Sequence, residues 1–127
     1  MDTITEAKRY VANAKEILRE KARKEDNLYQ DRKYVKMAGH TAYSGVLVAL
    51  DAVFNVKKKG RKSVEWYQAE LAKRDKKALS LFNSAYFTLH LALGYDGNTD
   101  ARVAKAGMDT AEEIIAWAKT KTENENN

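Results

Sequence analysis

The stretch Met37-Ala-Gly-His-Thr-Ala-Tyr-Ser-Gly-Val-Leu-Val-Ala-Leu-Asp-Ala-Val-Phe54 decides the fold of this chain. It contains one formally charged residue, Asp51, and small residues recur along it. Each glycine inside a helix costs about 1 kcal/mol relative to alanine, so a helix that keeps two of them is expected to gain close backbone contacts in return. We therefore predict a helix over about residues 31–54 and expect it to be the central, most buried element.

The segment before this helix predicts a second amphipathic helix over about residues 4–24. Apolar residues recur there at three- and four-residue steps from Ile4 to Ala22, and charged residues fill the remaining positions. Thr3 and Glu6 have the spacing of a capping box. Residues 25–27, Glu-Asp-Asn, interrupt the pattern and predict a turn.

The second half of the chain predicts further helices. Ser63 is the expected N-cap of a third helix, which either continues to about residue 93 or is broken by a bend near 72–76, where no apolar residue occurs between Ala72 and Lys77. Gly94 is the expected end of that region, and a tight turn follows it. A last helix is predicted over about 100–119, and the polar residues 120–127 predict a disordered tail.

Composition agrees with an all-α fold, because the chain has no Pro, six Gly and many Ala, Lys, Glu and Leu. The pattern predicts one domain, residues 1–119, built as a four-helix antiparallel up-down bundle. The absence of Cys excludes disulfides, thiolate metal sites and iron–sulfur clusters, and two His exclude a three-His zinc site. With apolar runs of about five residues and no signal pattern at the start, we expect a cytoplasmic protein without cofactor, metal or membrane contact.

A basic loop is the sharpest local feature of the sequence. Five cations occur within six residues: Lys57, Lys58, Lys59, Arg61 and Lys62. Such a cluster could contact RNA phosphates, with Trp66 and Tyr67 near it for base stacking. The alternative is a solvated turn whose charge aids solubility. The formal net charge of +5 is uneven, since residues 1–62 carry +7 and residues 63–127 carry −2.

Three polar residues in apolar stretches are further candidates: His40, His90 and Asp51. Histidine can act as a general base or a metal ligand, and these three could meet in a mononuclear metal site. Met37 and Phe87 occupy the positions three residues before the histidines, which excludes the Glu-x-x-His motif of di-iron bundles. The simpler interpretation is a pair of hydrogen-bonded core histidines, and we predict no metal site.

Two other features leave open whether the chain associates with a second copy of itself. Trp117 falls off the apolar stripe of the last helix, so it either faces outward as a dimer contact or packs at the rim of its own bundle. The small residues of the 31–54 helix serve either packing within the chain or pairing with a second subunit.

Several segments resemble the small bacterial helical bundles of the HEPN type. They are Ala7-Lys-Arg-Tyr-Val-Ala-Asn-Ala-Lys15, Ala38-Gly-His-Thr-Ala-Tyr-Ser-Gly45 and the stretch from Ala104 to Trp117. Ribonucleases of that family carry an Arg four to six residues before a His. Here Arg32 lies eight residues before His40, and Arg74 lies sixteen residues before His90. The resemblance therefore implies a bundle over about 4–118 and a non-catalytic, dimeric binding member of the family.

The sequence as a whole predicts a helical-bundle protein that is not an enzyme and that acts through a protein partner or as a homodimer. The alternative function is RNA binding, or a HEPN-like ribonuclease-related role, through the basic loop at residues 57–62.

Overall fold

The computed structural model describes residues 2–57 and 60–125, and most of them are helical, which confirms the all-α prediction. The elements, in chain order, are α1 (Thr3–Ile17) with its π-helical continuation η1 (Leu18–Ala22), a hairpin of β1 (Lys24–Glu25) and β2 (Leu28–Tyr29), α2 (Arg32–Phe54), α3 (Val64–Arg74), α4 (Lys76–Ala85) with its π-helical continuation η3 (Tyr86–Tyr95), and α5 (Ala101–Glu125).

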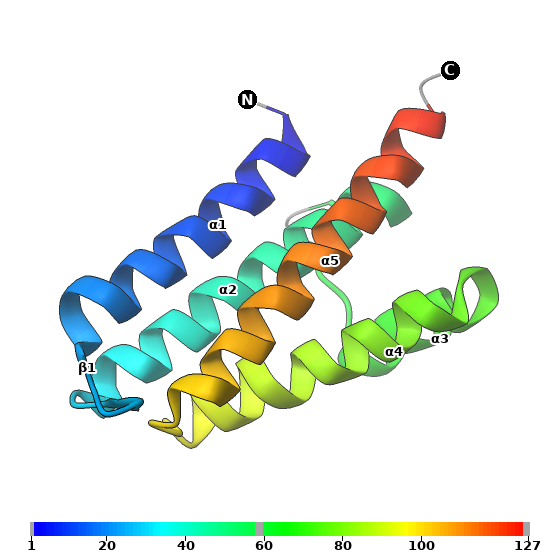
Figure 1. The fold of residues 1–127 in the computed structure, drawn as a ribbon. Helices are drawn as coiled ribbons and strands as arrows, with labels where there is room; N and C mark the ends of the chain where they lie inside the picture. The colour runs from blue at the N-terminus through cyan, green and yellow to red at the C-terminus, as the bar shows by residue number, and fades with distance from the viewer. Residues whose placement is uncertain (1, 58–59, 126–127) are drawn as a thin grey trace.

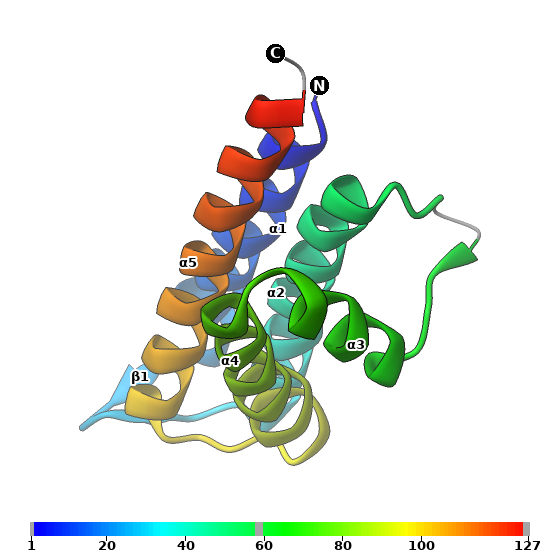
Figure 2. The same cartoon turned by 90° about the vertical axis from the view of Figure 1, so that its right-hand side faces the viewer.

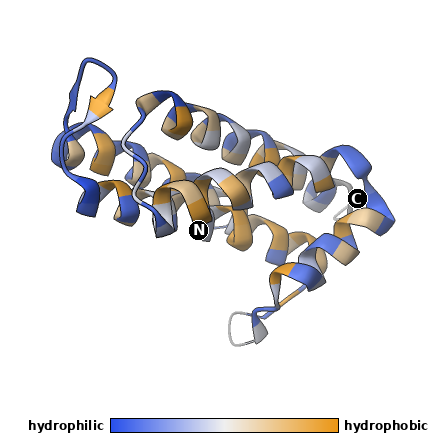
Figure 3. Ribbon diagram, turned by 90° about the horizontal axis from the view of Figure 1, so that it is seen from below, coloured by the Kyte–Doolittle hydropathy of each residue, from blue (hydrophilic) through white to orange (hydrophobic). Residues whose placement is uncertain are grey.

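The long helices lie side by side and alternate in direction. In Figure 1, α1 runs from the end that holds both termini toward the hairpin, α2 returns beside it, and α5 lies alongside both. Figure 2 shows α3 on the outer side of α4, away from α1. Hydrophobic segments of the helices face one another in Figure 3, whereas the hairpin end is largely hydrophilic.

Helix α2 is the central element, as its composition predicts. It packs against α1, η3 and α5, and side chains along most of its length are buried. A Cβ at Gly39 would lie 2.6 Å from both the backbone N of Gly94 and the backbone O of Leu89. At Gly45 it would lie 2.9 Å from the backbone O of Ala7. The small residues of α2 therefore serve close packing within the chain.

Acidic and hydroxyl side chains begin several helices. Asp2, and not Thr3 as the capping-box spacing predicts, caps α1: its carboxylate accepts a 2.9 Å hydrogen bond from the backbone N of Thr5. Ser63 caps α3 as predicted. Asp75 ends α3 and caps α4 by accepting from the backbone N of Lys77 and Ala78, so the bent alternative for residues 72–76 is the one observed.

The expected turn at residues 25–27 is a two-residue hairpin loop. Asp26 and Asn27 have φ values of 50° and 65°, the left-handed conformation that these short polar side chains tolerate best after glycine. The strands on either side are two residues long, too short for an alternating pattern to reveal them.

Two helix ends differ from the sequence prediction. The helix that was expected to end at Gly94 ends one residue later, at Tyr95. Helix α5 runs to Glu125, past the expected end at residue 119, and Lys119 and Glu123 form an i,i+4 ion pair of 3.9 Å in this added turn. The predicted tail, 120–127, is thus helical up to Glu125, and its last two residues lie outside the described ranges.

Helix α2 also has the length and apolar composition of a membrane-spanning helix, with a mean hydropathy of 1.2 over 18 residues. In the structure, 67% of that window is buried inside the fold. Burial of this kind is typical of a core helix, which passes the same test of length and composition.

Replacement of Gly39 by alanine should lower the free energy of unfolding. The added methyl group would meet backbone atoms of η3 at 2.6 Å, and backbone moves less readily than a side-chain end. We expect a loss in the upper part of the range of about 1–3 kcal/mol for overpacking, which exceeds the helix-propensity gain of about 1 kcal/mol. Urea unfolding measures the net change in the free energy of unfolding. Gly60→Ala is the control, since a Cβ there meets nothing within 4 Å; equal stability of the two variants would contradict the close contact.

Candidate functional site

The fold brings His40 and His90 together from α2 and η3. Their ring centroids are 5.7 Å apart in an edge-to-face arrangement, with His40 exposed and His90 partly buried. A Cβ at Gly94 would lie 2.8 Å from Cε1 of His40. The missing side chain at Gly94 therefore leaves the space in which the His40 ring lies against η3.

Tyrosine rings complete this cluster. The His90 ring stacks on Tyr86 with centroids 5.3 Å apart and lies 4.9 Å from the ring of Tyr43. The Tyr43 hydroxyl and His90 Nδ1 are buried without a hydrogen-bond partner among the described residues. Burial lowers the pKa of His90, with a further lowering from His40, and burial raises the pKa of Tyr43. The lowered pKa favours the neutral imidazole of His90, and the raised pKa favours the neutral phenol of Tyr43.

Asp51 does not join the histidines. It lies eleven residues after His40 on the same helix, a rise of about 16 Å. Its carboxylate accepts a 2.5 Å hydrogen bond from the Tyr67 hydroxyl and lies 3.6 Å from Nε of Arg61. Burial raises the pKa of Asp51, while the contacts with Tyr67 and Arg61 oppose that rise.

The phenol of Tyr67 responds to the same contact: burial, together with the Asp51 carboxylate, raises its pKa to about 12. Within the described residues, no group of three or more His, Asp or Glu side chains is arranged to hold a metal ion. Asp51 thus serves as the centre of a polar contact that joins α2, the residue 61 region and α3.

The basic loop is partly engaged in the fold. Arg61 pairs with Asp51, and Nζ of Lys62 lies 5.8 Å from the centroid of the Trp66 ring. Lys57 is exposed, and Lys58 and Lys59 lie outside the described residues. At least two of the five predicted RNA-contacting cations therefore have partners within the chain.

Trp117 packs at the rim of its own chain, the second of its two predicted alternatives. Its ring is partly buried, and its Nε1 donates a 3.0 Å hydrogen bond to Oδ2 of Asp75. This contact joins α5 to the break between α3 and α4, and it contributes to holding the pKa of Asp75 below its ordinary value, after the hydrogen bond from the Ala78 amide.

Exposed apolar side chains occur on the two elements that carry the histidines. Phe87 and Tyr95 of η3 are 65% and 73% exposed, and Met37 of α2 is 45% exposed. We give the name α2/η3 face to five side chains of these two elements: Met37, His40, Phe87, His90 and Tyr95. Neither η3 nor the α2 segment 37–50 contains a charged residue. The sequence analysis did not identify Phe87 and Tyr95. One signal was available: apolar residues surround η3 on almost every side, whereas a helix with one buried face needs them on that face only.

Comparisons with known proteins identify a family model and a solved structure that are similar to this chain. A family model described as "Domain of unknown function (DUF5618)" matches residues 2–120. A solved structure, that of a protein of unknown function from Dyadobacter fermentans, is similar to this chain, with 55% sequence identity, coverage of 94% of each chain and a TM-score of 0.87. No curated protein matches.

Removal of the Tyr67 hydroxyl should destabilise the fold. In Tyr67→Phe the buried Asp51 carboxylate loses its hydrogen-bond donor, which we expect to lower the free energy of unfolding by about 1–3 kcal/mol. Tyr95→Phe removes an exposed hydroxyl and is the matched control, with an expected change within about 0.5 kcal/mol. Chemical denaturation of both variants measures the difference, and a Tyr67→Phe variant as stable as the control would show that the contact is not stabilising.

His90 should make stability depend on pH. Its pKa is below the ordinary 6.5 in the folded chain, so on acidification the unfolded chain binds a proton first. The free energy of unfolding should therefore decrease as the pH falls from 6.5 toward the lowered pKa, and His90 should contribute no slope above 6.5. Urea unfolding of wild type and His90→Gln at a series of pH values isolates this contribution. If the free energies of unfolding of wild type and His90→Gln changed in parallel over this pH range, the lowered pKa of His90 would be contradicted.

Proposed function

The chain belongs to the family described as Domain of unknown function (DUF5618), and we propose that it is a non-catalytic cytoplasmic protein, a four-helix antiparallel bundle with α3 appended, that associates with a second copy of itself through the α2/η3 face.

The observation that carries this proposal is the combination of exposed aromatic side chains and absent charge on one surface. Phe87 and Tyr95 project from η3, which has no charged residue along its ten positions. Tyr95 directly follows Gly94, which lies against the His40 ring, and Phe87 is on the same π-helical element. Aromatic residues and methionine are enriched at the centres of protein interfaces, and charged residues are depleted there.

Charge favours a second copy as the occupant of this face. In a two-fold dimer each surface patch meets the same patch of the other subunit. A basic patch would then meet a basic patch, and this chain has a formal net charge of +5. The five side chains of the α2/η3 face avoid that repulsion when the histidines are neutral, although Lys36 and Asp96, the chain neighbours of Met37 and Tyr95, are exposed.

The architecture supports a dimer contact of this kind in a second way. Tyr43 and Tyr86 pack against each other and against the His90 ring of the face, so η3 is held to α2 by a layer of packed rings. Rigid anchors lose little conformational entropy on binding. The resemblance to HEPN-type bundles, which implies a dimeric binding protein, stays a prediction that agrees with this proposal.

RNA binding through residues 57–62 is the less supported alternative. Arg61 is paired with Asp51, and Lys62 lies over the Trp66 ring. A phosphate backbone would have to compete with these contacts for two of the five cations. RNA binding by this loop is therefore not part of the proposed function.

A charge placed on the α2/η3 face should abolish self-association. We expect wild type to sediment increasingly as a dimer as its concentration rises, and Phe87→Glu to weaken the dimer by at least about tenfold, because two carboxylates would meet in an apolar contact. Leu28→Glu is the matched control: Leu28 is 50% exposed and lies in the hairpin, which carries none of the five residues of this face. Sedimentation velocity over a concentration series measures both.

Two results would contradict the proposal. The first is a wild-type chain that stays monomeric at all concentrations. The second is a dimer that Leu28→Glu weakens as much as Phe87→Glu does, since the contact would then lie on another surface.

A further inference from the structure

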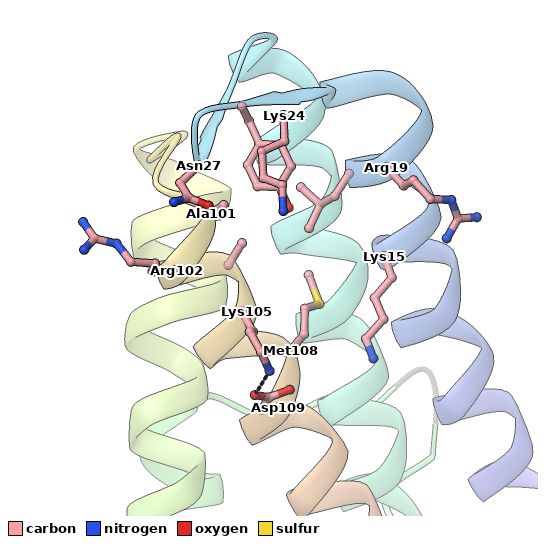
Figure 4. Close-up of a pocket in the computed structure, with 12 residues that line it drawn as sticks. Lys15, Arg19, Lys24, Asn27, Ala101, Arg102, Lys105, Met108 and Asp109 are labelled. Carbon is pink, nitrogen blue, oxygen red and sulfur yellow. Dashed lines mark hydrogen bonds and ion pairs between the residues drawn. The ribbon is translucent and has the colours of Figure 1, made fainter.

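A groove follows the seam between α1 and α5, on different elements from the α2/η3 face. Near the hairpin it opens into a cavity of about 560 Å³ lined by residues of α1, η1, the hairpin and α5 (Figure 4). A second cavity of about 440 Å³ adjoins it farther along the same two helices. Lys15 lines both cavities, and we call the two together, along the seam of α1 and α5, the groove.

Lysines dominate the rims of this groove. Lys15, Lys24 and Lys105 line the hairpin cavity, and Lys8 and Lys119 line the adjoining one. The two carboxylates among the lining residues are Asp109 and Glu112. The groove thus carries a net positive charge in a chain whose first 62 residues already have most of the excess cations.

The lysines are available to an incoming anion although three of them have partners, of which Lys119 pairs with Glu123 at 3.9 Å. Lys15 pairs with Glu112 at 2.6 Å across the seam, and Lys105 pairs with Asp109 at 2.8 Å. All six side chains are exposed by about half or more, and exposed ion pairs contribute roughly 0–1 kcal/mol. A ligand carboxylate can therefore replace any of the three acidic partners at little cost.

The floor of the groove is apolar and made of small side chains at its surface. Ala12 of α1 and Ala116 of α5 are exposed there, above the buried Val11 and Ile115. In the hairpin cavity Met108 provides the corresponding floor. Alanines on two adjacent antiparallel helices permit the close approach of a third helix.

We propose that this groove binds an acidic amphipathic helix of a partner protein. The small apolar residues of that helix would face Ala12 and Ala116, and its carboxylates would pair with the lysines of the rims. Between Lys8 and Arg19 helix α1 and its continuation rise about 16 Å, which matches three turns of a bound helix. Recognition of a helix by a groove of this kind rests on apolar anchors at helical spacing and on complementary charge.

The side chains of the groove favour carboxylates over a nucleic acid. Arginine is the usual residue for planar, two-pronged phosphate contacts. Figure 4 shows the guanidinium groups of Arg19 and Arg102 pointing away from the groove, and they pair with Glu20 and Asp100. Tyr29 is the aromatic residue that lines it, and this side chain is partly buried, so exposed rings for base stacking are missing from the lining residues.

Fluorescence anisotropy with defined probes tests the proposal. The first probe is a labelled helical peptide of about 14 residues with Ala and Leu on one face and Glu on both flanks. A second peptide has Lys in place of every Glu, and a third probe is single-stranded oligouridylate. We expect the acidic peptide alone to bind, with an affinity that falls as salt rises.

Matched variants locate the contact. Lys15→Gln/Lys105→Gln should weaken peptide binding about tenfold at low salt, because two rim cations are lost. Lys76→Gln/Lys77→Gln removes the same charge from exposed positions on α4 and should leave binding unchanged. In methyl NMR the bound peptide should shift the Met108 signal and not the Met37 signal, which separates this site from the α2/η3 face.

Three results would overturn the proposal: absence of peptide binding at low salt, equal weakening by both double variants, and binding of oligouridylate in preference to the acidic peptide. The last would assign the groove to RNA. None of them bears on self-association, which sedimentation tests separately.

Discussion

The backbone of α2 touches the backbone of η3 at Gly39, and the arrangement of the surrounding side chains depends on that contact. It brings Gly94 against His40 and so places the two histidine rings 5.7 Å apart. Tyr43, one turn after Gly39 on α2, then reaches the His90 ring from below. With its inner side occupied in this way, η3 directs Phe87 and Tyr95 outward, and the α2/η3 face results from the same close approach that builds the core.

The two surfaces singled out by the structure differ in the physical term that would drive binding. The α2/η3 face has aromatic rings and no formal charge, so burial of apolar area would dominate there. The groove between α1 and α5 has alanines and lysines, so its binding would depend on charge and would weaken with salt. Because Met37 belongs to the first surface and Met108 to the second, one chain offers a separate methyl probe for each.

Local chemistry explains which parts of the fold could be predicted from sequence. Helical periodicity predicted α1 and α2 to within a few residues, and Ser63 was correctly predicted as a cap because capping acts within one turn. The contact of Tyr67 with Asp51 spans sixteen residues, and the approach of His40 to His90 joins two helices. Contacts of this kind depend on how helices pack, which no local pattern encodes. The end of α5 was missed because the residues after 119 are polar and continue the helix, with one ion pair between Lys119 and Glu123, without an apolar stripe.

The central claim, that the α2/η3 face is where two copies meet, is tested most directly by methionine methyl NMR on the unmodified chain. The chain has three methionines, of which Met37 lies on this face and Met108 is buried at the floor of the groove. Over a dilution series that takes the chain from dimer to monomer, the account predicts that the Met37 signal shifts and the Met108 signal does not. A Met37 signal that stays constant while sedimentation shows the dimer dissociating would contradict it.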